Sequence, residues 1–185
     1  MLKNWLEVAA TQLLINPSLF WLPAGLPFLK LGETKFYTDF SVTRMDPVRA
    51  GLLRRWKERL AHATASRVAH AEQVLRFFAS SPVQTIKPSQ RDHSVYLRLP
   101  LLMRSKQEKE ALCRVSGEQG LGVSSMYPSS LQHIAELREK LSSRDVPQST
   151  MIAERLVTLP THELLSARDL ERICHAVQDV LRVEG

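Results

Sequence analysis

The sequence has little cysteine: Cys113 and Cys174 are its only two among 185 residues. Two cysteines cannot form the disulfide framework of a small secreted domain. Both fall within predicted helices, which indicates reduced thiols and a cytoplasmic protein. The first residues, MLKNWLEVAATQLLI, are interrupted by Glu7 and are not followed by a small-residue cleavage site, so they do not predict a signal peptide.

Long apolar runs and the common chemical motifs are also missing. No stretch reaches the ~18 uncharged apolar residues that a membrane-spanning helix needs. The sequence contains no P-loop, no G-x-S-x-G turn, no G-x-G-x-x-G and no metal-ligand spacing. The nearest glycine group, Gly117, Gly120 and Gly122, is typical of a helix stop and a turn. We therefore expect no metal site in this chain.

What is present is enough apolar sequence for a core and an uneven distribution of charge. Hydrophobic residues make up 44% of the chain, which carries a net charge of +6. Residues 1–92 have 13 Lys and Arg against 7 Asp and Glu, whereas residues 93–185 have 12 of each kind. Residues 81–93 are polar and contain two prolines, so they predict a linker. The expected parts are a helical segment over 1–80, this linker, and a domain over 94–185.

Residues 96–128 predict a strand, a helix and a second strand in succession. The apolar run 96–103 is too short for an isolated helix and favours a buried strand. Ser105 followed by Glu108 is a capping box that begins a helix, and Gly117 or Gly120 can end it. Residues 123–127 read as the returning strand. A helix between two strands indicates an α+β fold with helices covering a sheet.

The rest of the domain continues the same pattern. Ser129 or Ser130 can cap a helix that runs to Leu141, and Ser149 or Thr150 a short helix to residue 155. The sequence LVTLP at 156–160 predicts a third strand. Ser166 begins the last helix with Asp169 in the capping-box position, and the helix has an apolar face composed of Leu170, Ile173, Cys174, Val177 and Leu181.

The first 80 residues predict two long helices separated by an apolar, irregular segment. The first helix covers 1–15, and the second covers 47–80 with Asp46 as its cap. Between them, Pro23 and Pro27 forbid a continuous helix through SLFWLPAGLPFLKLGET. Side chains of this size need a cover, which is either another part of the fold or a membrane interface.

The second long helix begins with a cluster of basic residues: Arg49, Arg54, Arg55, Lys57 and Arg59. Such a cluster can neutralise phosphates, so a nucleic-acid binder is one hypothesis. Glu58 interrupts the cluster and no DNA- or RNA-binding motif accompanies it, so we expect a solvated helix face and no nucleic acid. His62 and His70 lie eight residues apart, which is too far for two metal ligands on one helix.

The tail RLVTLPTHELLSARDLERICHAVQDVL resembles the C-terminal signature of the pyridoxal-phosphate-dependent DegT/StrS sugar aminotransferases, of fold type I. The matching positions are Leu159, Pro160, His162, Leu165, Ser166 and Asp169. YLRLPLLM, GLGVSSMYP and SLQHI follow the small domain of that family in order, and LPFLKLGET is similar to the segment that joins its two domains. The resemblance implies long N-terminal helices followed by a small three-stranded, mainly antiparallel sheet covered by helices.

The resemblance also implies a function: the chain is the C-terminal part, a fragment or a split-gene product, of an aminotransferase acting on keto-sugar nucleotides with an amino donor, usually glutamate. In that family a lysine and an aspartate of the large domain hold pyridoxal phosphate. No lysine here lies in the family's Ser-rich lysine context. We therefore expect no catalytic or cofactor-binding residue, no bound pyridoxal phosphate and no transamination by this chain alone.

Three residues are candidates for substrate binding. The family often has His-Tyr-Pro at the end of the small domain's second strand, where this chain has Met126-Tyr127-Pro128. Tyr127 keeps the match, and Arg98 and His162 are further candidates. Each also has an ordinary structural explanation, as a strand-end, strand-face or turn residue.

The expected partners are a large domain, on an upstream polypeptide, and a second copy in a homodimer. The alternatives are a free-standing interaction module derived from such an enzyme, and a nucleic-acid binder that uses the cluster from Arg49 to Arg59.

Overall fold

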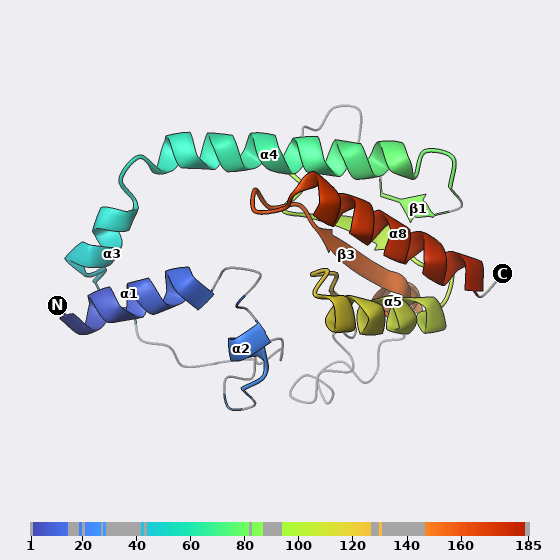
Figure 1. Cartoon of the computed structure of the whole chain (residues 1–185), viewed down its shortest axis with the longest axis horizontal. Helices are drawn as coiled ribbons and strands as arrows, with labels where there is room; N and C mark the ends of the chain where they lie inside the picture. The colour runs from blue at the N-terminus through green and yellow to red at the C-terminus, as the bar shows by residue number, and fades with distance from the viewer. Residues whose placement is uncertain are drawn as a thin grey trace. The chain divides into compact units, whose positions relative to one another are not determined.

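The computed structural model (Figure 1) describes residues 2–14, 19, 21–26, 28, 42, 44–81, 83–86, 94–126, 130 and 147–183. The chain divides into two compact units, Met1–Arg59 and Leu60–Gly185. This division falls inside helix α4 (Trp56–Phe77), upstream of the boundary that the sequence predicts at 81–93. Assignment of residues 1–80 to a larger domain remains a proposal.

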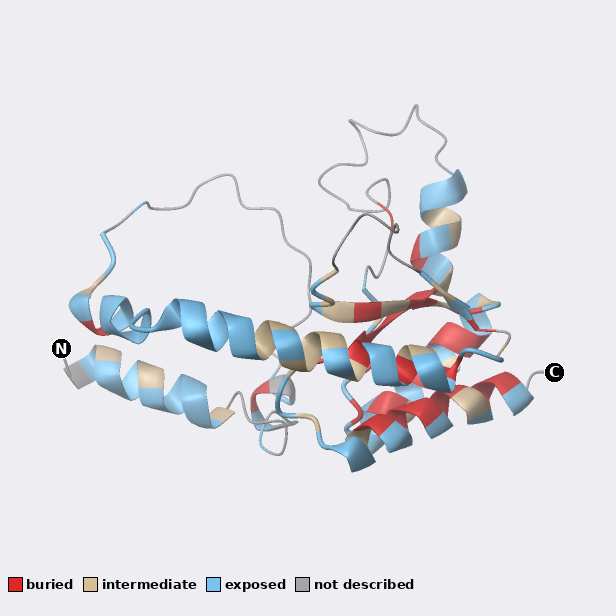
Figure 2. Cartoon of the chain, turned by 90° about the horizontal axis from the view of Figure 1, so that it is seen from above, coloured by how far each residue is buried: buried red, intermediate tan, exposed pale blue. Residues whose placement is uncertain are grey.

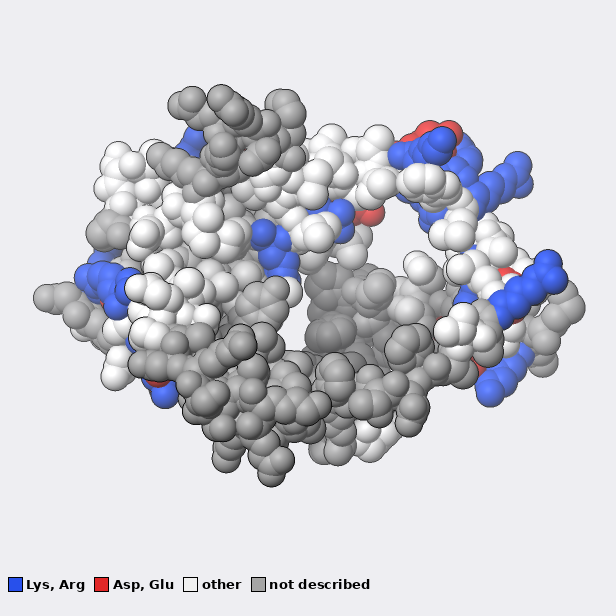
Figure 3. Space-filling model, turned by 180° about the vertical axis from the view of Figure 1, so that it is seen from behind, with Lys and Arg blue, Asp and Glu red and all other residues white. Residues whose placement is uncertain are grey.

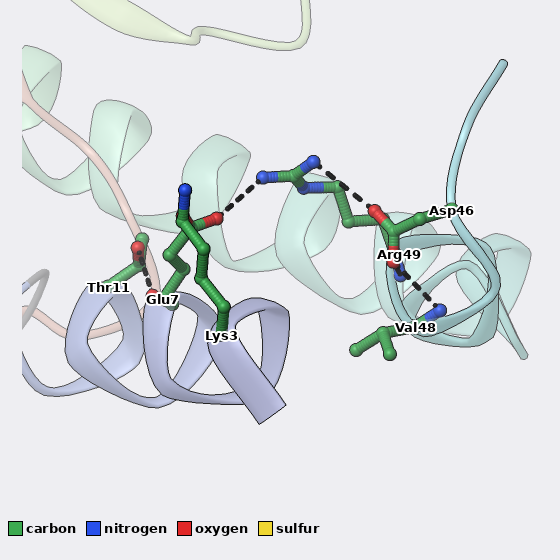
Figure 4. Close-up of polar contacts among 6 residues, drawn as sticks. All are labelled: Lys3, Glu7, Thr11, Asp46, Val48 and Arg49. Atoms are coloured by element: carbon green, nitrogen blue, oxygen red, sulfur yellow. Dashed lines mark hydrogen bonds and ion pairs between the residues drawn. The ribbon is translucent and has the colours of Figure 1, made fainter. Parts of the chain in front are cut away.

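The first unit is helical in its described part. Helix α1 (Leu2–Leu14) confirms the first predicted helix, and α2 (Trp21–Ala24) is a single turn. Helix α3 (Pro47–Leu52) begins as expected at Asp46, whose carboxylate accepts from the backbone N–H groups of Val48 and Arg49. The Arg49 guanidinium lies 3.0 Å from the Glu7 carboxylate and 3.2 Å from that of Asp46, and so joins α1 to α3 (Figure 4).

The prediction of one continuous helix over 47–80 is wrong. The helix ends at Leu52, and α4 starts at Trp56 after a turn in which Arg55 has the left-handed φ of 56°. The Arg59 guanidinium donates to the carbonyl oxygens of Leu52 and Arg54. A side chain therefore satisfies two carbonyl groups that a continuous helix would have bonded to its own backbone.

The second unit contains a three-stranded antiparallel sheet, as the resemblance implied. Strand β2 (Arg98–Leu102) pairs with β3 (Leu156–Pro160), with Arg98 opposite Pro160. Strand β1 (Gln84–Thr85) pairs with the other edge of β2, so the order is β1-β2-β3. Two of the three predicted strands are confirmed, and β1 lies within the segment that we predicted as a linker.

The third predicted strand, 123–127, is reduced in its described part to one bridge between Ser124 and Thr158 of β3. The reason lies in the bonds of Val123. Its backbone N–H donates to Ser116 Oγ at 2.9 Å, and Ser116 Oγ donates in turn to its carbonyl oxygen at 3.3 Å. Val123 is therefore bonded to a helix rather than to the sheet.

Helices cover the sheet, and their ends follow the capping residues. Helix α5 (Lys106–Gln119) begins at Ser105, whose hydroxyl accepts from Glu108 N, and ends at Gly120 with φ 64°. Helix α7 (Pro147–Arg155) starts two residues before the predicted cap at Ser149. Helix α8 (Ala167–Val183) begins as predicted. The helix expected to run to Leu141 lies outside the described residues.

The core lies between the sheet, α5, α8 and the second half of α4. Figure 2 shows the buried residues along β3 and along one side of α8, whereas α1 and the start of α4 are mostly exposed. Helices α5 and α8 pack against each other. The core residues include Ala71, Val74, Leu99, Leu101, Leu112, Val157, Leu159, Ile173 and Val177. Among the described helices, none is long and apolar enough to cross a membrane.

Candidate functional site

Arg98, the first residue of β2, is fixed by three hydrogen bonds. Its Nε donates to Thr158 Oγ1 at 2.7 Å, and its Nη2 donates to the carbonyl oxygens of Thr158 at 2.9 Å and Gly122 at 2.6 Å. Burial lowers the pKa of Arg98 from its usual value. Since Gly122 precedes the segment that bridges β3, Arg98 holds that segment against the sheet.

His162 lies two residues after the end of β3, and its ring is half-buried. Its Nδ1 is buried and has no hydrogen-bond partner. Burial lowers the pKa of His162, and the positive charges of Arg98, His70 and Arg67 lower it further, while Asp169 acts in the opposite direction. The imidazole of His162 is therefore mainly neutral at pH 7.

The structure adds two residues of α4 that the sequence analysis did not select for this site. His70 Nδ1 lies 3.1 Å from the carbonyl oxygen of Thr161 and so acts as the donor. Arg67 Nε is buried and has no hydrogen-bond partner. A signal existed in the sequence, because Arg67 and His70 share a helix face with Ala71 and Val74, which belong to the core.

The turn that carries His162 is held in place by Thr161. This residue is buried, and its hydroxyl donates to the carbonyl oxygen of Tyr96 at 2.6 Å. The bond ties the end of β3 to the residues that lead into β2. His162 and Arg98 are therefore both positioned at one end of the same strand pair.

We call Arg67, His70, Arg98 and His162 the basic cluster. Its members come from α4, from β2 and from the turn after β3. No ion pair of Arg67 or Arg98 occurs in the described part of the chain. Asp169, a carboxylate that acts on His162, is hydrogen-bonded to Ser166. The cluster can donate hydrogen bonds to a polar or negatively charged group.

Two of the three predicted substrate-binding residues, Arg98 and His162, thus belong to one cluster. The third, Tyr127, lies outside the described residues. Its neighbour Met126 has its sulfur 3.9 Å from Thr158 Oγ1, the same hydroxyl that accepts from Arg98. A role in substrate binding remains a proposal for all three residues.

The basic residues at the start of α4 are visible in Figure 3 as Lys and Arg side chains with few acidic neighbours. Most of them have interactions within the chain. Arg59 bonds two carbonyl groups, Arg55 lies 3.9 Å from Glu58, and the Lys57 ammonium lies 5.8 Å from the centre of the Trp56 ring. These contacts are those of a solvated helix face, so this surface gives the nucleic-acid hypothesis no specific support.

The described lysines do not fit pyridoxal phosphate. Lys3, Lys57 and Lys106 are exposed, whereas Lys109 is buried and its ammonium donates to the carbonyl oxygen of Ala153. Burial lowers the pKa of Lys109, and the carboxylates of Glu110 and Glu154 act in the opposite direction. We therefore derive no catalytic step through this cofactor. Within the described ranges, no three His, Cys, Asp or Glu side chains gather as metal ligands either.

Comparison with known sequences and structures places these observations in a wider context. The sequence pattern of the DegT/DnrJ/EryC1/StrS aminotransferase family matches residues 33–178. A search of curated proteins gives no match.

Several solved structures share the fold. PseC of Helicobacter pylori, an aminotransferase involved in the biosynthesis of pseudoaminic acid, superposes with a TM-score of 0.67 at 16% identity, over 82% of this chain and 43% of PseC. DesV of S. venezuelae gives 0.64 at 18% identity, over 79% of this chain and 40% of DesV. TlmJ of Streptoalloteichus hindustanus, also an aminotransferase, superposes with a TM-score of 0.56 at 20% identity, over 69% of this chain and 34% of TlmJ. This chain thus spans less than half the length of each of these proteins.

Proposed function

Since the chain belongs to the DegT/DnrJ/EryC1/StrS aminotransferase family, we propose that it is the C-terminal, small-domain part of a sugar aminotransferase. The observation that carries the proposal is the second unit itself. This unit has a three-stranded antiparallel sheet with the family's Leu-Pro strand end, turn and last helix. The whole chain spans only 34–43% of the length of PseC, DesV and TlmJ.

In this proposal the complete enzyme passes an amino group from a donor such as glutamate to a keto-sugar nucleotide. Pyridoxal phosphate, when bound, supplies the electron sink for that reaction. The large domain holds the cofactor, and this chain contributes Arg98, His162 and Tyr127 toward the substrate. The chain acts in the cytoplasm and is inactive when it is alone.

The first unit supports the idea of a larger partner. Side chains of α1 and of the residues around α2 are exposed despite being large and apolar: Trp5, Leu6, Leu13, Leu22, Leu26 and Phe28. Apolar side chains that gather on a surface mark an interaction site. We propose that a large domain covers them, and that a second copy completes a dimer.

A free-standing interaction module is the alternative, because the same exposed side chains could bind a different protein. The two proposals differ in one respect. A small-domain part recovers transaminase activity when it is combined with its large domain, whereas a module does not.

The test has two steps. Purified chain is incubated with pyridoxal phosphate, reduced with borohydride and mapped by mass spectrometry. We expect no lysine to be labelled stoichiometrically, and the variant Lys109→Arg controls for background at the buried lysine. Stoichiometric labelling of one lysine would refute a cofactor site outside this chain.

The second step is co-expression with the upstream polypeptide, for which we expect co-purification and activity with glutamate and a keto-sugar nucleotide.

A further inference from the structure

The basic cluster contains two buried side-chain nitrogen atoms that have no hydrogen-bond partner in the described part of the chain. Arg67 Nε and His162 Nδ1 are the buried side-chain nitrogen or oxygen atoms without a hydrogen-bond partner in the described part of the chain. Buried polar groups are nearly always paired, and an unpaired donor costs stability. The charge of Arg67 acts on His162, so the two unpaired atoms belong to side chains that influence each other. This indicates that the two side chains share a function.

The charge of the cluster points to the kind of group that would pair with them. Arg67 and Arg98 bring two permanent positive charges close to His162, and the carboxylate of Asp169, which acts on His162 in the opposite direction, is hydrogen-bonded to Ser166. A half-buried positive charge without a counterion is unfavourable. An anion that accepted from Arg67 and His162 would balance this charge and satisfy both donors.

The roles of the four residues are distinct. Arg98 uses Nε and Nη2 for Thr158 and Gly122, so it contributes charge rather than those donors. His70 donates to Thr161 O and thereby fixes the turn on which His162 lies. Arg67 Nε and His162 Nδ1 are left as the groups that can contact a ligand.

We propose that the basic cluster is a binding site for an oxyanion, a phosphate or carboxylate group that accepts from Arg67 Nε and His162 Nδ1. The proposal does not depend on the function proposed above, because all four residues belong to the second unit of this chain. The same site would serve a free phosphorylated metabolite or a substrate that carries such a group.

The test is a titration of the whole chain with inorganic phosphate in a chloride buffer at neutral pH. Isothermal titration calorimetry measures the binding. We expect saturable binding of one phosphate per chain. Since a charge-assisted hydrogen bond contributes about 1.5–3 kcal/mol, Arg67→Gln and His162→Gln each weaken binding by about tenfold or more. Acetate in place of phosphate shows which of the two oxyanions the site prefers. Absence of saturable binding of both would overturn the proposal.

Two control variants match the tested ones. Arg76→Gln removes an arginine of the same helix that is exposed and paired with Glu72, and His175→Gln removes an exposed histidine of α8. Both should bind phosphate as tightly as the unmodified chain. Equal weakening by Arg67→Gln and Arg76→Gln would show a general effect of charge and contradict a specific site.

A second measurement covers the case in which a variant fails to fold. The ring signals of His162 in the unmodified chain are followed by NMR against pH, with and without phosphate. A bound anion favours the imidazolium form, so phosphate should raise the pKa of His162, and the ring signals of the exposed His175 serve as the internal control. No difference between the two titrations would refute the site.

Discussion

Arg98 on β2 and Thr158 on β3 are joined by two hydrogen bonds from one guanidinium, to the hydroxyl and to the carbonyl oxygen of the threonine. The same guanidinium reaches Gly122, and Thr158 also pairs with Ser124 through the backbone. Arg98, which we selected as a candidate substrate contact, therefore also has a structural role. It holds the segment after α5 on the outer side of β3.

The first prediction concerns the hydrogen bonds of Arg98 to Thr158 and Gly122. Arg98→Met removes three hydrogen bonds, each worth about 0.5–1.5 kcal/mol, and should lower the free energy of unfolding by about 1.5–4.5 kcal/mol. Urea denaturation measures this change. Arg114→Met, on an exposed position of α5, is the control and should have an effect below about 0.5 kcal/mol. Equal stability of the two variants would contradict a structural role for the three hydrogen bonds of Arg98.

The second prediction concerns Glu108, which is 2% exposed. Its carboxylate accepts from Arg104 N at 2.8 Å and from Arg104 Nε at 2.5 Å, and Arg104 Nη2 donates to Leu181 O at 2.7 Å on α8. Removal of one partner from a buried ion pair costs about 3–5 kcal/mol. Since Arg104 is partly exposed, we expect the lower end of that range for Glu108→Ala.

Thermal unfolding with circular dichroism checks this value. The control is Glu110→Ala on the same helix, which removes an exposed carboxylate 4.0 Å from Lys106. An exposed pair contributes about 0.2–1 kcal/mol. Similar melting temperatures for the two variants would contradict a structural role for the buried carboxylate.

Local signals in the sequence were sufficient for most of the second unit. Ser166 and Asp169 form the reciprocal capping box that the sequence predicts, and the apolar face of α8 is buried from Leu170 to Leu181. Both features depend on residues a few positions apart. A helix or a strand of this kind can therefore be predicted without the rest of the fold.

The features that were missed depend on distant contacts. Strand β1 has two residues between prolines and exists because Gln84 pairs with Leu102. The break before α4 is stabilised by the side chain of Arg59, and no proline marks it. The basic cluster depends on the hydrogen bond between His70 and the carbonyl oxygen of Thr161, two residues that lie 91 positions apart in the sequence. Neither periodicity nor spacing contains that information.

The third prediction is a dependence on pH. Hydrogen bonds from the Ser166 hydroxyl and backbone N–H lower the pKa of Asp169 below its usual value of 3.8. Because the pKa is lower in the folded state, the carboxylate stabilises the fold fully above the unfolded pKa of about 3.9, and this contribution is lost as the pH falls through the folded pKa.

Asp169→Asn should therefore be less stable than the unmodified chain at pH 7, by about 0.5–1 kcal/mol for a partly exposed cap. The difference should shrink as the pH falls below 3.8. Urea denaturation over a series of pH values measures it. A difference that stays constant down to the lowest pH would mean that the charge of Asp169 has no part in the cap.

The fourth prediction concerns the two thiols, which are both free in the structure. Burial raises the pKa of Cys174 to about 11, and burial also raises the pKa of Cys113, against the opposite effect of Lys109. Only the thiolate reacts with alkylating reagents. At pH 8 iodoacetamide should therefore modify the half-buried Cys113 before Cys174, as mass spectrometry of digested samples would show. In denaturant the two rates should become similar, and faster native modification of Cys174 would contradict its burial.

The fifth prediction concerns the exposed apolar side chains of α1. Trp5 is 58% exposed and Leu6 is 62% exposed, although residues of this kind normally lie inside a fold. If a large domain covers them in the complete protein, the chain alone should bind a hydrophobic dye and associate with itself. Replacement of both by glutamine should reduce dye fluorescence and sharpen the monomer peak in gel filtration, with little loss in the free energy of unfolding.

The outcome separates an interface from a core. Core positions would lose stability on such a change, because each large apolar side chain contributes about 2–5 kcal/mol when buried. Val183→Gln, which removes an isolated apolar side chain that is 84% exposed at the end of α8, should leave dye binding unchanged. A sharp monomer peak and no dye binding for the unmodified chain would show that this surface needs no cover, and would favour a free-standing protein over one part of an aminotransferase.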